Sequence, residues 1–153
     1  MRRQLKIRLF RATVESILLY GSETWTVTEA LAKWIDGCYT RMLRMALDVP
    51  WYLRVTNSEV YGRLSRVTET IRGRRLRLTG HVERHEELIA RDLLFWDPTQ
   101  ATHGSRGRGR PKTTYVDVLM RDTGLDSLAE IQRMMQDRVL WRQFIMSRTL
   151  KPP

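Results

Sequence analysis

The 153-residue sequence predicts an all-α, or mostly α, fold: a small helical bundle with a basic extended loop around residues 98–112. Apolar side chains recur every three or four residues over most of the chain, which is the period of an amphipathic helix. Three segments have capping-box spacing, a Ser or Thr followed three residues later by Glu: Thr26–Glu29, Thr56–Glu59 and Ser127–Glu130. A hydrophobic content of 42%, with five Trp and seven Met, is enough for a core.

The first two helices are predicted from their apolar faces. The first runs roughly from residue 3 to 20, with Arg8, Arg11 and Glu15 on its polar face. Its apolar face comprises Leu5, Leu9, Phe10, Val14, Ile17 and Leu18. The second begins in the Thr26–Glu29 box and should end before Pro50. Its stripe comprises Leu31, Trp34, Ile35, Cys38, Met42, Met45 and Ala46.

The next two helices differ in charge. A short helix opens at the Thr56 box and continues through Leu64. A basic helix with one buried edge follows, and Gly80 lowers its propensity near the end. Its apolar stripe is formed by Val67, Ile71, Leu78 and Val82, and the rest of its circumference carries Arg72, Arg74, Arg75 and Arg77.

The C-terminal part is predicted from its breakers and caps. Residues 88–96 form either a helix or, at LLFW, a strand, and Asp97-Pro98 ends that element. After the loop of residues 98–112, a helix starts at Thr113 or Thr114 and closes at Gly124. Another follows Ser127, and Asp137 caps or kinks a last one. We therefore expect a helical region 1–97, a basic linker 98–112 and a C-terminal helical hairpin 113–153.

Charge indicates nucleic acid as the partner. The formal net charge is +10, and 23 of the 27 basic residues are Arg, whose planar guanidinium pairs with phosphate oxygens. Eight of those ten net charges lie in two segments, 66–84 and 104–112. No apolar stretch approaches the roughly 20 residues that cross a bilayer, so no membrane partner is expected.

The basic helix is the first candidate phosphate-binding element. Arg72, Arg74, Arg75 and Arg77 lie within six residues and Arg84 follows. Four cations with no acid between Ile71 and Leu78 repel one another unless they are neutralised, which favours phosphate contact. The alternative is a solvated face.

The second candidate is the run GSRGRGRPK, Gly104 to Lys112, which has neither a helix nor a strand pattern. Its cations are Arg106, Arg108, Arg110 and Lys112. The stretch 108–112 resembles the RGRPK core of the AT-hook, which implies two Arg along an A·T-rich minor groove. The alternative is a flexible basic linker that doubles as a nuclear import signal. The protein is accordingly expected in the nucleus or cytoplasm and not secreted.

No catalytic or metal site is predicted, and no cofactor. The acids are dispersed, without the clustered carboxylates of two-metal phosphoryl transfer. His81 and His85 lie four apart but lack a third ligand, Cys38 lies on an apolar stripe, and Asp117 with Arg121 is interpreted as a helix-surface pair. Among the tryptophans, Trp25, Trp34 and Trp141 are expected in the core, whereas Trp51 and Trp96 are weaker base-stacking candidates.

Six strings occur in the same order as in the carboxy-terminal region of non-LTR retrotransposon reverse transcriptases, and the resemblance covers nearly the whole chain. The strings are LLYGSETW (18–25), RMLR (41–44), VTNSEV (55–60), IRGRRLRLTGHVERH (71–85), GRGRPKTTYVD (107–117) and DRVLWRQF (137–144). The resemblance implies that Leu5 to Tyr20 is a thumb helix and that a connector and tail follow. The family's palm, with its metal-binding aspartates, would lie before Met1.

Together these features predict a nucleic-acid-binding fragment, not an enzyme, that contacts the phosphate backbone of RNA or an RNA/DNA duplex and has no catalytic site of its own. The resemblance adds the missing polymerase palm as a second partner. Two alternatives remain open: an AT-hook-like DNA-binding module, and an inert retroelement remnant with exposed apolar faces.

Overall fold

The computed structural model describes residues 2–85, 89–96 and 113–149, and confirms the all-α prediction. Within these ranges every regular element is helical and no strand occurs. The α-helices are α1 (Arg3–Phe10), α2 (Ser16–Leu18), α3 (Glu29–Ala46), α4 (Asn57–Tyr61), α5 (Val67–Glu83), α6 (Ile89–Leu94), α7 (Tyr115–Thr123), α8 (Leu128–Gln136) and α9 (Arg138–Thr149). Short 3-10 turns lie at Ser22–Thr24 and Trp51–Leu53, and no described helix is long and apolar enough to cross a membrane.

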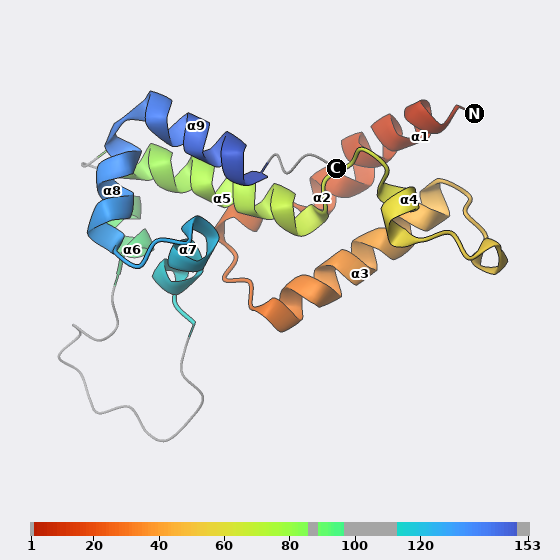
Figure 1. Ribbon diagram of the computed structural model, residues 1–153, viewed down its shortest axis with the longest axis horizontal. Coiled ribbons are helices and arrows are strands. Elements are labelled where there is room, and N and C mark those ends of the chain that lie inside the picture. The colour runs from red at the N-terminus through yellow and green to blue at the C-terminus, as the bar shows by residue number, and fades with distance from the viewer. Residues whose placement is uncertain (1, 86–88, 97–112, 150–153) are drawn as a thin grey trace, which may run out of the picture.

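Helix α5 runs through the centre of the molecule and packs on both halves of the chain (Figure 1). It contacts α3 and the turn Ser22–Thr24, and also α8 and α9. One core cluster therefore surrounds each half: Phe10, Leu19, Val27, Ile35, Tyr39, Leu43, Val60, Tyr61, Val67 and Ile71 form the first, and Leu76, Leu119, Ile131, Met135, Trp141 and Ile145 form the second. The helices before and after residues 98–112 are held together through α5.

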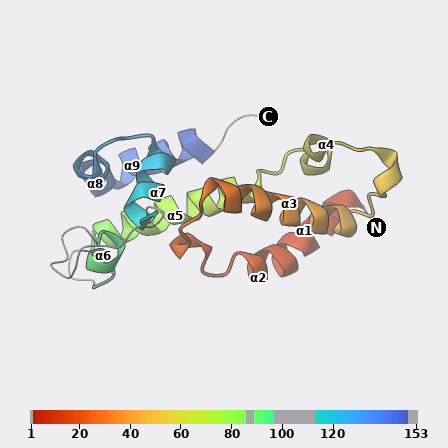
Figure 2. The same cartoon turned by 90° about the horizontal axis from the view of Figure 1, so that it is seen from below.

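The N-terminal helix has the predicted extent but buries only part of the predicted face, chiefly Phe10. It continues from α1 into α2 through a π-helical turn at Arg11–Glu15 and packs along α3 (Figure 2). Leu5, Leu9 and Ile17 are 47%, 48% and 78% exposed, whereas Glu15 is buried and accepts a 2.7 Å hydrogen bond from the Tyr39 hydroxyl. The face that α3 covers includes this satisfied carboxylate, so the most apolar stripe of the helix is left exposed.

Helix α3 shows the same shift. Ile35, Tyr39 and Leu43 are buried, whereas Trp34 and Met45, both predicted in the core, are 67% and 71% exposed. The prediction that Trp34 is a core residue is therefore wrong. Trp141 is buried as predicted and Trp25 is half-buried.

Burial on α5 is not confined to one apolar edge. Leu76 is fully buried, whereas the predicted core residue Leu78 is only half-buried. Arg75, Thr79 and Glu83 are buried as well. Because neighbours contact α5 on several sides, polar side chains with internal partners take positions that an apolar stripe cannot indicate.

The capping boxes were predicted with mixed success. The box of Thr56 and Glu59 forms. Helix α3, however, is capped by Thr28, whose hydroxyl accepts from the Leu31 amide, and not by Thr26. The Ser127 side chain makes no capping hydrogen bond, although α8 begins directly after it.

Most of the remaining boundaries follow the predictions, but α4 ends at Tyr61 and not at Leu64. At LLFW the structure has no strand: Leu93 and Leu94 end α6, and Phe95 and Trp96 follow the helix. Thr114 caps α7 in a box with Asp117, and α7 ends at Gly124, whose φ of 68° is left-handed. The Asp137 carboxylate accepts from the Val139 and Leu140 amides at 2.8 and 3.0 Å and so caps α9.

Candidate nucleic-acid interface

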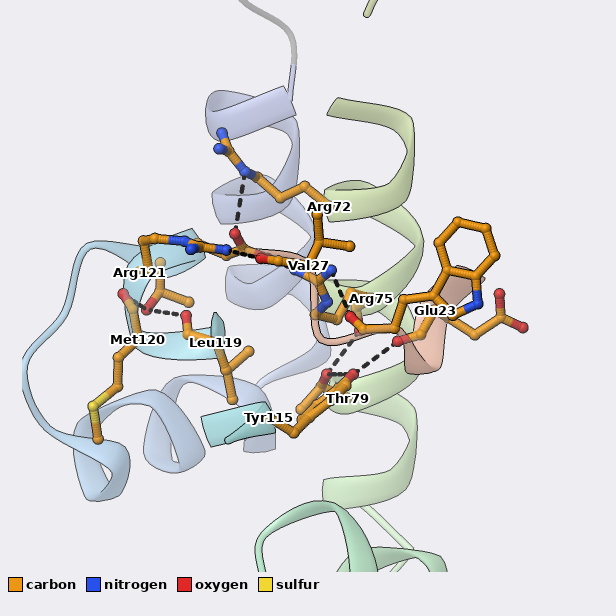
Figure 3. Close-up of polar contacts among 12 residues, drawn as sticks. Glu23, Val27, Arg72, Arg75, Thr79, Tyr115, Leu119, Met120 and Arg121 are labelled. Atoms are coloured by element: carbon orange, nitrogen blue, oxygen red, sulfur yellow. Dashed lines mark hydrogen bonds and ion pairs between the residues drawn. The ribbon is translucent and has the colours of Figure 1, made fainter. Parts of the chain in front are cut away.

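Two of the predicted phosphate-binding arginines are held in an internal ion-pair cluster (Figure 3). The Arg75 side chain is 3% exposed and pairs with the Asp122 carboxylate, whose side chain is 4% exposed. A second N–H of Arg75 donates to the carbonyl of Trp25 at 2.9 Å. Arg72 contacts the other Asp122 oxygen at 3.5 Å and Glu69 at 3.2 Å. Arg75 cannot reach phosphate in this conformation, which corrects the prediction for that residue.

The same region carries further hydrogen bonds between distant segments. Tyr115 donates to the carbonyl of Glu23 at 3.1 Å and its hydroxyl lies 3.2 Å from that of Thr79 (Figure 3). Burial raises the pKa of Tyr115. Arg121 donates to the Val27 carbonyl, and Asp117 accepts in the α7 cap, so the predicted Asp117–Arg121 surface pair is wrong. This cluster fixes α7 against α5 and the Ser22–Val27 segment.

The charge repulsion expected among the α5 arginines is relieved from within the protein. Asp122 and Glu69 neutralise Arg72 and Arg75, and Arg74 donates to the Leu19 carbonyl at 2.8 Å. The neutralising acid Asp122 lies 47 residues from Arg75 along the chain, so local sequence patterns do not reveal the pair. An acid-free run of arginines is thus not by itself evidence of bound phosphate.

The other two predicted arginines, Arg77 and Arg84, border a groove between α5 and α9. The groove has a volume of about 540 Å³ and is lined by Arg77, His81, Arg84, Arg138, Trp141, Arg142, Ile145 and Met146. None of these described lining residues is acidic. Arg77 and Arg84 each use one of five N–H donors internally, to Gly73 and Met135 carbonyls at 2.9 and 2.8 Å. Their remaining donors can serve an anion.

Close packing of two helices creates the groove. The Trp141 indole donates to the Leu76 carbonyl at 2.9 Å, and a Cβ at Gly80 would collide with the Trp141 ring. Gly80 is therefore needed for close approach, which explains a residue that weakens helix propensity. The apolar groove floor comes from the buried side of α9, and its rims carry the cations.

Glu83 is the acidic residue nearest in sequence to the groove residues His81 and Arg84, but its partners lie outside the groove. Glu83 is 2% exposed and accepts from Arg91, Gln132 and Gln136. These partners belong to α6 and α8, so the Glu83 carboxylate holds those helices to α5 and does not neutralise the groove.

Sequence reasoning missed two basic residues of the groove, Arg138 and Arg142. The signal was present, because Arg138 and Arg142 lie four apart and so share one helix face.

The two histidines within the described residues contact each other. The rings of His81 and His85 lie 4.5 Å apart between centroids at the end of α5. Among the described residues no group of three His, Cys, Asp or Glu side chains could hold a metal ion. The predicted phosphate-binding residues of the basic run 104–112, called the arm below, are Arg106, Arg108, Arg110 and Lys112. They lie outside the described residues.

Comparison of the chain with protein-family models, with curated proteins and with solved structures finds no match.

Proposed function

We propose that this protein binds nucleic acid through its phosphate backbone, and that it acts as a binding module without a catalytic site of its own. The observation that carries the proposal is the α5–α9 groove, in which five basic side chains, from Arg77, His81, Arg84, Arg138 and Arg142, surround one hollow. Neutralising phosphates releases their condensed counterions, which supplies most of the affinity of such sites.

The basic run of residues 104–112 adds a second contact in the proposal. Its four cations carry no acid among them, and in the sequence the run lies between α6 and α7, which each contact α5. A second contact on the same chain raises affinity by effective concentration. RNA, an RNA/DNA hybrid and DNA are all candidate ligands of the protein. The AT-hook-like core predicts a preference for A·T duplex, but only for the contact made by the arm.

The proposed relation to the carboxy-terminal region of non-LTR retrotransposon reverse transcriptases agrees with one structural observation. Leu5, Leu9 and Ile17 of the N-terminal helix, with Trp34 and Met45 of α3, are all at least 47% exposed. Apolar surface of this kind is typical of a protein contact, and the polymerase palm is the partner that the resemblance supplies.

Fluorescence anisotropy tests the binding function. The probes are single-stranded RNA, double-stranded RNA, an RNA/DNA hybrid, and A·T and G·C duplexes, each titrated from about 50 to about 200 mM salt. The groove variant is Arg138→Ala/Arg142→Ala, and the arm variant is Arg108→Ala/Arg110→Ala. The matched control, Arg41→Ala/Arg63→Ala, removes the same charge from exposed positions on the other half of the protein.

The groove variant is expected to weaken binding and to reduce the slope of log K against log salt by about 1.4 to 1.8. The control is expected to change both quantities far less. Equal losses in the groove variant and the control would remove the groove from the proposal, and failure of every probe to bind at about 50 mM salt would overturn the function itself.

A further inference from the structure

The basic residues that line the groove form two short rows. On α5, Arg77, His81 and Arg84 follow one another at helical spacing, and on α9 Arg138 and Arg142 lie one turn apart. At about 1.5 Å per residue the α5 row spans roughly 10 Å and the α9 row about 6 Å. The two helices run side by side, so the rows face each other across the hollow (Figure 1).

The rows do not extend further toward the start of α5. The preceding arginines do not line the groove: Arg74 donates to the Leu19 carbonyl, and Arg72 and Arg75 pair with Asp122. The basic length of the groove therefore corresponds to about three nucleotides of one strand, at about 3.4 Å per nucleotide along the helix axis. A duplex site of six to ten phosphate contacts requires a longer surface.

Two exposed aromatic rings lie near the C-terminal end of α5, one within the α5 row and one just beyond it. His81 lines the groove, His85 is one turn further along, and their rings are in edge-to-face contact at 4.5 Å. Histidine rings serve as stacking surfaces for unpaired bases. A base in a duplex is stacked on both faces and cannot use them, whereas a base of a single strand can.

We infer that the α5–α9 groove binds single-stranded nucleic acid, with the sugar-phosphate backbone between Arg77, Arg84, Arg138 and Arg142 and a base against His81 and His85. This inference rests on the proposed function and specifies its ligand. Side chains of Trp141, Ile145 and Met146 supply an apolar floor for the sugar or base. Cations along a groove with aromatic rings beside them are the combination that single-strand-binding proteins use.

The test compares a fluorescein-labelled single-stranded 12-mer with the same sequence as a blunt duplex. The protein carries Arg108→Ala/Arg110→Ala, so that duplex binding by the arm does not mask the groove. The expected result is at least tenfold tighter binding of the single strand. His81→Ala/His85→Ala should weaken single-strand binding about tenfold with little change in salt slope. His81→Phe/His85→Phe should largely restore it, because the rings remain and the basic groups do not.

Each opposing result has its own meaning. Duplex binding that equals or exceeds single-strand binding would overturn the inference and leave the binding function standing. Equal losses for single strand and duplex in the His→Ala variant, or no rescue by Phe, would overturn the stacking role of the two rings. If neither the single strand nor the duplex binds, both in this variant background and in the unaltered chain, the binding function itself is overturned.

Discussion

The indole N–H of Trp141 donates a 2.9 Å hydrogen bond to the backbone carbonyl of Leu76, and so fixes α9 against α5. The Trp141 ring also stacks on Phe144, with centroids 5.3 Å apart. The bond and the stack are both internal to the second core cluster. They set the distance between the two helices whose arginines border the groove.

Replacement of Gly80 by Ala tests this close approach. The added Cβ would collide with the Trp141 indole, so we expect a loss of about 1–3 kcal/mol in the free energy of unfolding, measured by urea denaturation. Gly37→Ala is the matched control, because a Cβ at that exposed position of α3 meets nothing within 4 Å. It should stabilise the protein by up to about 1 kcal/mol through helix propensity. Equal effects at the two glycines would contradict the packing role of Gly80.

Loss of the Asp122 carboxylate should be among the most damaging single changes. Asp122→Ala leaves the guanidinium of Arg75 buried and without its counter-charge, which costs about 3–5 kcal/mol in proteins. Replacing both partners, with Arg75→Met and Asp122→Leu, should cost clearly less, since no unpaired charge remains. Asp126→Ala, at an exposed position four residues along, should change stability by no more than about 0.5 kcal/mol. A double variant less stable than Asp122→Ala would contradict this account.

Sequence reasoning identified what depends on local chemistry. Most helix boundaries, the Thr114 and Asp137 caps and the end of α7 at Gly124 are set within a few residues, and the structure agrees with them. The all-α class follows from the same local signals.

What could not be predicted depends on partners distant in sequence. Which face of the N-terminal helix is buried depends on the hydrogen bond that Glu15 accepts from the Tyr39 hydroxyl, 24 residues further along the chain. The burial of Arg75 depends on Asp122, and the groove depends on where α9 crosses Gly80. The sequence therefore located two of the groove cations, Arg77 and Arg84, but not the surface to which they belong.

Caps with and without a side-chain hydrogen bond provide a direct comparison. The Thr114 hydroxyl accepts from the Asp117 amide at 3.1 Å, whereas Ser127 makes no capping bond. Thr114→Ala should lower the free energy of unfolding by about 1 kcal/mol and Ser127→Ala by only a few tenths. Thermal or urea unfolding of the two variants measures the difference. A larger loss at Ser127 would show that the predicted Ser127 box forms in solution.

Alkaline pH should weaken the contact between α1 and α3 through Tyr39. Burial, and then the hydrogen bond to Glu15, raise the pKa of Tyr39 well above its ordinary value of about 10. Because the folded state holds this proton more tightly than the unfolded state, the stabilisation is complete below about pH 10 and declines as pH rises further.

Urea unfolding from about pH 9 to 11 should show this decline in the unaltered chain, and a smaller one in Tyr39→Phe. Tyr20→Phe is the control, since Tyr20 is 87% exposed, and it should keep the full decline. A Tyr39→Phe variant that loses stability with pH as steeply as the Tyr20→Phe control would contradict this role for the Tyr39 hydroxyl.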